Sequence, residues 1–206
     1  MAWPTPGLWR VEVSHDADIA LLRAVSRAEA RAETELVRRL MPVLRAVARS
    51  ILGSGSDADD GVQIALLRVL ERASTYRGDA ALEGWARTIG VRACLRHSET
   101  LRRHRPSDDA VDEQPPAATD DEDTLVDELP GSIAEYLERL PDTQRQALVL
   151  RHALGYSVVE VAELLSVPVD TAKSRLLFGL RALRKAIRRD QLVGVRDGAT
   201  IGGRRA

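Results

Sequence analysis

The stretch from Gly155 to Arg184 constrains the fold more than any other part of the chain, because it predicts two short helices joined by a tight turn. Ser157 is a favourable N-cap and Glu160 follows three residues later, which is the capping-box pattern. Pro168 ends the first helix, since the residue before a proline is disfavoured in the α region, and it suits the start of the second. The apolar spacing predicts that the two helices pack through Val161, Ala162, Leu165, Val169, Ala172 and Leu176.

The second helix of this pair leaves a polar face on the outside near its N-terminus, formed by Asp170, Thr171, Lys173, Ser174 and Arg175. In a helix-turn-helix, this part of the second helix reaches base edges in the major groove. The helix continues with a basic run suited to phosphate contact: Arg181, Arg184, Lys185, Arg188 and Arg189. On the pattern alone, two other interpretations stay open: a packed hairpin without a DNA role, and a basic run that is a solvated helix face.

The composition favours an all-α protein of one or two domains. Of the 206 residues 44% are hydrophobic and only 3% aromatic, and Ala, Leu and Arg dominate while β-branched runs are short. The periodicity predicts further helices near 16–28, 33–52, 57–73, 82–105, 133–140 and 141–153. Pro42 predicts a kink or a short break in the second of these.

The charge is segregated along the chain, although the net charge is only −1. Residues 31–105 carry a net +5 and residues 132–189 a net +4, whereas residues 106–131 carry ten acidic residues and no basic one. We therefore predict a flexible extension at 1–15, a helical domain at 16–105, a flexible acidic Pro-rich linker at 106–131, a helical domain at 132–189 and a flexible tail at 190–206. Two basic domains are expected if each meets a polyanion.

Several classes of function are disfavoured by what the sequence lacks. Cys94 is the only cysteine, which leaves no disulfide framework and fits a cytoplasmic location. The four histidines have no metal-ligand spacing and there is no Gly-rich phosphate loop, so we expect no metal and no cofactor. Cys94 and His97 lie one helical turn apart, but no third orienting group accompanies them, and we expect no enzyme activity. No apolar run reaches the roughly 18 residues of a membrane span, so no membrane insertion is expected.

Two runs of sequence resemble bacterial RNA polymerase sigma factors of the extracytoplasmic-function (ECF) group. Residues 57–95, DADDGVQIALLRVLERASTYRGDAALEGWARTIGVRACL, resemble the second conserved region of that group. Residues 137–176, LERLPDTQRQALVLRHALGYSVVEVAELLSVPVDTAKSRL, resemble its fourth. The joint occurrence of both regions in this order is more specific than either alone, and the resemblance covers about residues 18–188 apart from the linker.

The resemblance implies two small helical domains that bind core RNA polymerase and promoter DNA and so direct transcription initiation. At the minus-35 element it implies contacts from Asp170, Thr171, Lys173, Ser174, Arg175 and Arg181. For the melted minus-10 strand the cationic candidates are Arg77, Arg87, Arg92 and Arg96. Asp60 and Gln63 match an Asp-x-x-Gln pattern that faces the clamp helices of the polymerase. An anti-sigma factor is a further candidate partner.

The chain departs from the family pattern at several positions. Gly61 stands where an apolar residue is usual, Ile64 replaces a Glu, Arg92 replaces an Asn that captures a base, and Ser166 replaces a Gly in the turn. Three alternatives follow: a helix-turn-helix regulator that is not a sigma factor, a helical adaptor without a DNA role, and a sigma-like protein with lost or altered polymerase binding.

Overall fold

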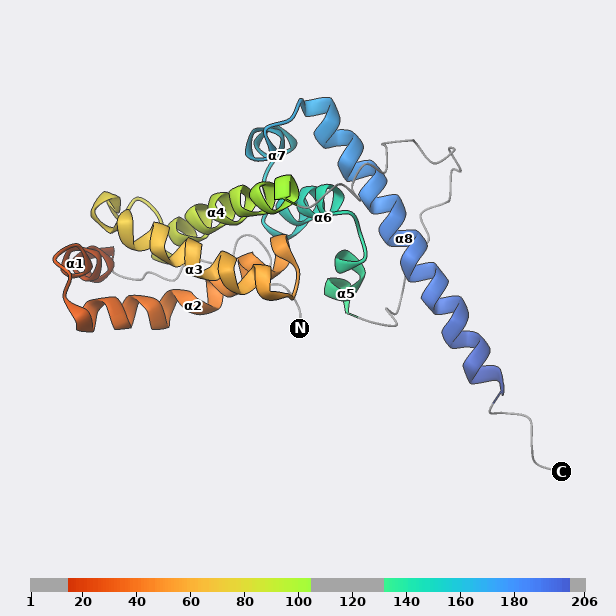
Figure 1. Cartoon of the computed structure of the whole chain (residues 1–206), viewed down its shortest axis with the longest axis horizontal. Helices are drawn as coiled ribbons and strands as arrows, with labels where there is room; N and C mark the ends of the chain where they lie inside the picture. Colours follow the sequence, from red (N-terminus) through yellow and green to blue (C-terminus); the bar gives the residue numbers. More distant parts are fainter. Residues whose placement is uncertain (1–14, 105–131, 201–206) are drawn as a thin grey trace. The chain divides into compact units, whose positions relative to one another are not determined.

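The computed structural model describes residues 15–104 and 132–200, which form two compact units, one in each range (Figure 1). The described residues form helices and turns without a strand, as the composition predicted. The expected linker at 106–131 lies outside the described residues, as does the expected extension except for His15, the first residue of α1. Within the described ranges, no helix has both the length and the hydropathy needed to cross a bilayer.

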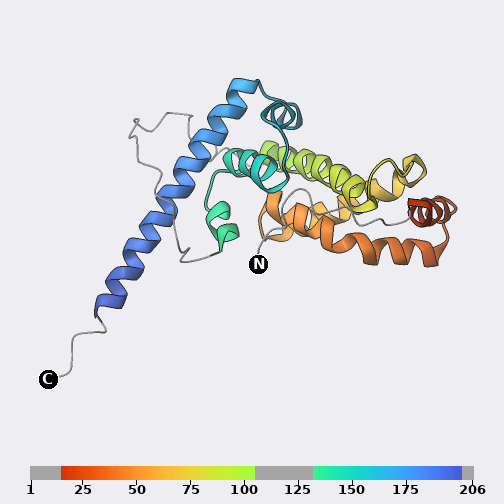
Figure 2. The same ribbon diagram turned by 180° about the vertical axis from the view of Figure 1, so that it is seen from behind.

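The first unit is a bundle of three long helices with a shorter helix packed against it. The shorter helix is α1 (His15–Ser26), and the bundle comprises α2 (Ala30–Leu52), α3 (Ser56–Glu71) and α4 (Leu82–His104). A short turn of 3-10 helix, η1 (Ala73–Thr75), follows α3. The three long helices lie side by side in both views (Figures 1 and 2). Their core is a stack of large aliphatic side chains that includes Leu36, Leu40, Leu44, Val69 and Leu82.

Local details of this unit test the expected helices. The helix α2 continues through Pro42, so it has no break at this residue. The other expected outcome, a kink at Pro42, stays a prediction. The helix α1 ends at Ser26, so the expectation that Ala28 belongs to it was wrong: Ala28 is exposed and adopts a left-handed φ of 56° in the turn before α2. Trp85 is half-buried at the edge of the core, where its ring meets Tyr76 edge-to-face at 5.3 Å.

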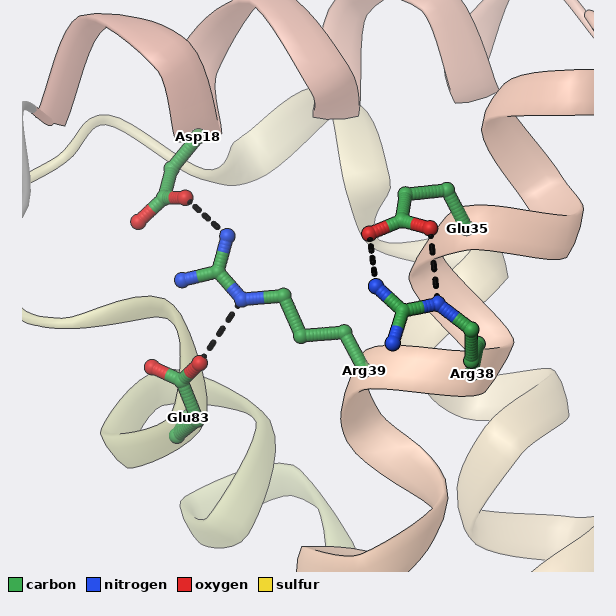
Figure 3. Close-up of polar contacts among 5 residues, drawn as sticks. All are labelled: Asp18, Glu35, Arg38, Arg39 and Glu83. Carbon is green, nitrogen blue, oxygen red and sulfur yellow. Dashed lines mark hydrogen bonds and ion pairs between the residues drawn. The ribbon is translucent and has the colours of Figure 1, made fainter.

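A network of charged side chains joins α1, α2 and α4. Arg39 of α2 donates from Nη1 to Asp18 Oδ1 of α1 at 2.5 Å and from Nε to Glu83 Oε1 of α4 at 2.8 Å (Figure 3). The side chain of Asp18 is only 1% exposed and that of Arg39 is 26% exposed. Burial alone would lower the pKa of Arg39, but the hydrogen bonds to Glu83 and Asp18 outweigh it and raise that pKa. The network therefore fixes α1 on the bundle through a desolvated ion pair.

The second unit is built around one long helix, α8 (Val169–Thr200). Three shorter helices pack on it: α5 (Ile133–Glu138), α6 (Asp142–Leu148) and α7 (Val158–Leu165). The segment η2 (Val149–Ala153) extends α6 as a π-helix. The helix expected at 141–153 therefore has nearly the predicted length, but it changes from α-helix to π-helix after Leu148. Buried side chains from all the elements form the core, including Tyr136, Leu148, Leu150, Val161, Ala172, Leu176 and Ile187.

The helix α8 is longer than the sequence predicted. The domain was expected to end at Arg189 and to be followed by a flexible tail, whereas α8 continues to Thr200. Glycine disfavours a helix by only about 1 kcal/mol, and elongating a formed helix adds a hydrogen bond with each residue, so glycines beyond Arg189 do not end it. Asp190 also belongs to the domain, because its Oδ2 accepts a hydrogen bond at 2.6 Å from Arg139, the C-cap residue of α5.

Candidate nucleic-acid interface

The helices α7 and α8 form the expected helix-turn-helix. Glu160 N donates to Ser157 Oγ at 3.2 Å, and Ser157 N donates to Glu160 Oε2 at 2.8 Å, which confirms the predicted capping box. Hydrogen bonds from Ser157 to the carboxylate lower the pKa of Glu160, and the bond from the Ser157 backbone N–H is the largest cause. After α7, Ser166 takes a left-handed φ of 55°, the conformation for which glycine is usual. Ser166 thus adopts at this turn a conformation that a Gly would adopt without strain.

The start of α8 presents one exposed ion pair to solvent. Lys173 Nζ lies 3.0 Å from Asp170 Oδ1, and both side chains are exposed, that of Lys173 at 62%. Ser174 Oγ donates to the carbonyl oxygen of Asp170 at 3.0 Å, so this hydroxyl is engaged with its own helix. Thr171 and Ser174 are half-buried rather than fully outward.

Two further predicted contacts, Arg175 and Arg181, are half-buried, and the Nε atom of Arg175 is shielded from solvent. The expectation that Val169 packs inward was wrong, because its side chain is 37% exposed. It is the first residue of α8 and so lies at the edge of the contact with α7. Leu177, two turns further along, is 48% exposed, and the sequence reasoning did not single it out. The outer face of α8 is therefore less polar than predicted.

In the first unit, the four predicted arginines do not form one cluster. Arg92 and Arg96 of α4 line a groove of about 200 Å³ between α3 and α4. Arg77 lines a separate cavity of about 290 Å³ together with Tyr76 and residues of α1. Arg87 is half-buried and lies about 140° around α4 from Arg92, at 100° per residue.

The groove contains cationic side chains that the sequence reasoning did not nominate, namely Arg68 of α3 and Arg72, the C-cap residue of that helix. The available signal was their spacing: Arg68 and Arg72 follow Ile64 at intervals of four residues, which predicts one side of a helix for all three. Ile64 itself is half-buried in the lining of the groove. The residue that replaces the family's usual Glu thus contributes to the apolar part of this groove.

The proposed polymerase-binding pair, Asp60 and Gln63, is exposed on α3, as the periodicity predicted. The glycine between them is buried for a structural reason. A Cβ atom at Gly61 would lie 2.4 Å from Leu52 Cδ1 at the end of α2, so the two helices approach closely there. Cys94 Sγ also donates a weak hydrogen bond to the Gly61 carbonyl oxygen at 3.8 Å. The departure from the family at this position therefore accompanies close packing behind the exposed pair.

Cys94 has the environment of a core residue. Its side chain is fully buried, and burial raises the pKa of its thiol to about 12. A thiol with this pKa is almost entirely protonated at neutral pH, and the thiolate is the nucleophilic form. No group of three metal-ligating side chains gathers within residues 15–104 and 132–200.

Comparisons with known proteins match both units to one family. The family model for sigma-70 region 2 matches residues 36–105, and that for sigma-70 region 4 matches residues 131–183. The ECF RNA polymerase sigma factor SigM of Mycobacterium tuberculosis is 34% identical over 159 residues, which cover 77% of this chain and 79% of SigM. The chain belongs to the ECF group of RNA polymerase sigma factors. It therefore directs promoter-specific transcription, and the alternative of an unrelated helix-turn-helix regulator is not favoured.

A second curated relative is matched over nearly its whole length. The ECF RNA polymerase sigma-E factor of Escherichia coli is 26% identical over 176 residues, which cover 81% of this chain and 92% of the relative. Among solved structures, the sigma factor RpoE in complex with the anti-sigma factor NepR from Bartonella quintana matches with a TM-score of 0.48 and 22% identity, over 75% of this chain and 96% of the other. CnrH in complex with the cytosolic domain of CnrY matches with a TM-score of 0.46 and 22% identity, over 85% and 99%.

Proposed function

We propose that this sigma factor binds core RNA polymerase through the exposed face of α3 and recognises a promoter with both units. In this mechanism, the second unit reads the minus-35 element as duplex, and the first unit captures the melted strand of the minus-10 element. An anti-sigma factor is a further proposed partner on the strength of the family. The proposed location is the cytoplasm, where polymerase and promoters are found.

The observation that carries the proposal is the exposed pair of Asp170 and Lys173 at the start of α8, directly after a capped first helix. The N-terminal residues of a recognition helix contact base edges in the major groove. There a lysine ammonium can donate to the guanine O6 and N7 acceptors, and a carboxylate can accept from the cytosine amino group. We propose that Asp170 and Lys173 exchange their mutual ion pair for these base contacts.

The other predicted minus-35 residues take different parts in this proposal. Thr171 and Ser174 are only half-buried, so each retains exposed surface beside the pair. Arg175 and Arg181 are long side chains that can extend toward phosphates from half-buried positions. Contacts to phosphates fix the register of a protein on duplex DNA but carry no sequence information.

For the melted strand, we propose contacts in two places. Arg77 is exposed at the cavity that it lines, where its guanidinium group can stack on an unpaired base. Arg92 and Arg96 are exposed on one side of α4 and suit the backbone of the same strand. Arg87 would contact DNA from a different side of α4. Capturing an unpaired base offsets an unstacking free energy of a few kcal/mol.

We propose that Asp60 and Gln63, which are both exposed on α3, form the face that binds the polymerase.

The decisive experiment is reconstitution with core polymerase that carries no other sigma factor, followed by sequencing of the transcript start sites. We expect transcripts from a defined promoter set that the core enzyme alone does not produce. An Asp60→Ala, Gln63→Ala double variant should lose association with the core enzyme but keep duplex binding by the second unit. Failure of the native chain to associate with the core enzyme would overturn the proposal.

A second experiment separates base reading from phosphate contact, using two exposed lysines of α8, Lys173 and Lys185. We expect Lys173→Ala to weaken binding to the selected minus-35 duplex by about 1–3 kcal/mol and to relax preference at one base position. Lys185→Ala, the matched control, should weaken binding almost equally for all sequences and reduce the salt slope by about 1. Binding would be measured by fluorescence anisotropy over a salt series. Identical behaviour of the two variants would remove Lys173 from the base-reading set.

A further inference from the structure

Leu177 lies in the middle of the charged outer face of α8, and its side chain is 48% exposed. Asp170 and Lys173 precede it on this face, and Arg181 and Arg184 follow it. At 100° per residue, all four of these positions lie within about 40° of Leu177 around the helix. Charged side chains therefore flank this leucine on both sides along the face that is proposed to enter the major groove.

The core of the second unit does not need a leucine at this position. Among the side chains of α8 that the structure describes, the buried apolar ones are Ala172, Leu176 and Ile187. Leu177 keeps almost half of its surface in water, so a partner that covers it gains hydrophobic free energy in proportion to the apolar area removed from water. Single exposed leucines are common on protein surfaces. It is the position of this one, among the proposed base-reading side chains, that points to a ligand.

The major groove of DNA offers one group that suits an apolar side chain. The base edges there present hydrogen-bond donors and acceptors, and thymine adds a C5-methyl group. A leucine side chain has no donor or acceptor, so on a polar base edge it would displace water without replacing the lost hydrogen bond, which is unfavourable. Against a thymine methyl group both surfaces are apolar, and their contact is favourable. A leucine on this face therefore favours T over C, A or G at one position.

We propose that Leu177 reads a thymine of the minus-35 element by covering its C5-methyl group in the major groove. This role rests on the proposed function, because it requires the start of α8 to lie in that groove. Leu177 is four residues from Lys173, or about 6 Å along the helix axis, and successive bases are about 3.4 Å apart along the duplex. We therefore expect the thymine within about two base pairs of the base that Lys173 contacts. Leu177 thus adds an apolar contact to a base-reading set that otherwise consists of polar and charged side chains.

The test removes the methyl group from the DNA and its partner from the protein. The full chain is titrated with the selected minus-35 duplex, in which each thymine in turn, on either strand, is replaced by deoxyuridine. Deoxyuridine forms the same base pair but lacks the methyl group. Binding is measured by fluorescence anisotropy at constant salt. We expect one replacement to weaken binding about fourfold, the factor that corresponds to about 0.8 kcal/mol for one buried carbon group.

Four variants assign this difference to a side chain. Leu177→Ala should bind the thymine and deoxyuridine duplexes equally, whereas Leu177→Met retains a large apolar side chain and should keep most of the difference. Val159→Ala is the matched control, because Val159 is 54% exposed in the same unit but belongs to α7. It should keep the fourfold difference. Lys173→Ala should weaken binding to both duplexes by the same factor, which separates loss of a charged contact from loss of the methyl contact.

The outcomes separate this role of Leu177 from the proposed function. Equal affinity of the native chain for the thymine and deoxyuridine duplexes at every position overturns the role, and so does a fourfold difference that persists in Leu177→Ala or disappears in Val159→Ala. If the native chain nevertheless selects a minus-35 sequence, the proposed function stands and only the leucine contact is lost. A native chain with no preference among duplex sequences refutes both, because α8 then reads no bases.

Discussion

The two units use their charged side chains in different ways. In the first, Arg39 bonds to Asp18 and Glu83, which lie 21 and 44 residues away in the sequence, and Asp18 is almost fully buried. In the second, the long-range pair between Arg139 and Asp190 lies at the surface, with side chains 53% and 32% exposed. The first unit thus holds α1 through a desolvated charge network that joins three helices, whereas the buried arginine of the second unit, Arg145, pairs with Asp142 at 2.6 Å within the single helix α6.

The largest expected effect comes from breaking that network. Removing the guanidinium group in Arg39→Met leaves Asp18 buried without its bridging cation, and breaking a buried ion pair typically costs 3–5 kcal/mol. Because Arg39 is partly exposed, we expect about 3 kcal/mol of destabilisation, confined to the first unit. Denaturant unfolding followed by the fluorescence of Trp85, in a Trp3→Phe, Trp9→Phe background, measures it.

The neighbouring pair supplies the control for this experiment. Arg38 bonds to Glu35 within α2, and both side chains are exposed enough for water to screen the interaction (Figure 3). We expect Arg38→Met to leave the unfolding midpoint essentially unchanged. If the two variants behave alike, the network is not what holds α1, and the contrast between the units disappears.

A smaller effect tests close packing, using one glycine in each unit. At Gly179 of α8 an added Cβ would lie 3.0 Å and 3.1 Å from two atoms of Leu148, one of them the branching Cγ. At Gly61 the distance is shorter, 2.4 Å, but the contact is the terminal methyl of Leu52, a half-buried side chain that can rotate away. Gly→Ala gains about 1 kcal/mol of helix propensity at either site, against an overpacking cost of about 1–3 kcal/mol.

We therefore expect Gly179→Ala to destabilise the second unit by about 1 kcal/mol and Gly61→Ala to change the first unit little. Native-state hydrogen exchange, assigned to residues of each unit, measures both changes without assuming that the units unfold together. If Gly61→Ala lost more stability than Gly179→Ala, the distance from the added Cβ to the contacted atom would decide the loss of stability, and the freedom of the contacted side chain to move would not.

The same contrast explains which parts of the interface the sequence predicted. Lys173 and Asp170 lie within one turn of one helix, so the period of a helix was enough to place them together on an exposed face. The groove between α3 and α4 needs two helices in a particular pairing, and residue spacing contains no information on that pairing. The sequence reasoning therefore nominated Arg92 and Arg96 but not Arg68 and Arg72, which line the same groove.

Other expectations failed where packing at the end of a helix decides the outcome. The burial of Val169 depended on whether α7 extends far enough to cover the first residue of α8, and it does not. The loss of helix propensity at Gly61 was visible in the sequence, but the close approach of Leu52 behind it was not. The roles of the DNA-binding and polymerase-binding residues stay predictions.

The smallest expected effect concerns acid stability of the second unit, where Glu160 closes the capping box. Its pKa is lowered in the folded chain by hydrogen bonds from Ser157, so the carboxylate stabilises the fold above its ordinary pKa of 4.5. That contribution is lost as the pH falls from 4.5 through the lowered pKa. A Gln at this position keeps an acceptor for the Ser157 N–H but does not titrate. We therefore expect Glu160→Gln to change stability little at pH 7 and to reduce the loss of stability on acidification.

Glu163→Gln is the matched control, because Glu163 is exposed on the same helix and takes no part in the capping box. Asp190, whose pKa is lowered chiefly by its hydrogen bond from Arg139, remains in both variants and preserves part of the acid sensitivity. For each variant, hydrogen exchange measures the free energy of opening at pH 5 and at the lowest pH at which the unit stays folded. The difference between the two variants in how much this free energy falls is the contribution of Glu160. Equal acid sensitivity in both would mean that the surface pair of Arg139 and Asp190, rather than the cap of the helix-turn-helix, governs how this unit responds to pH.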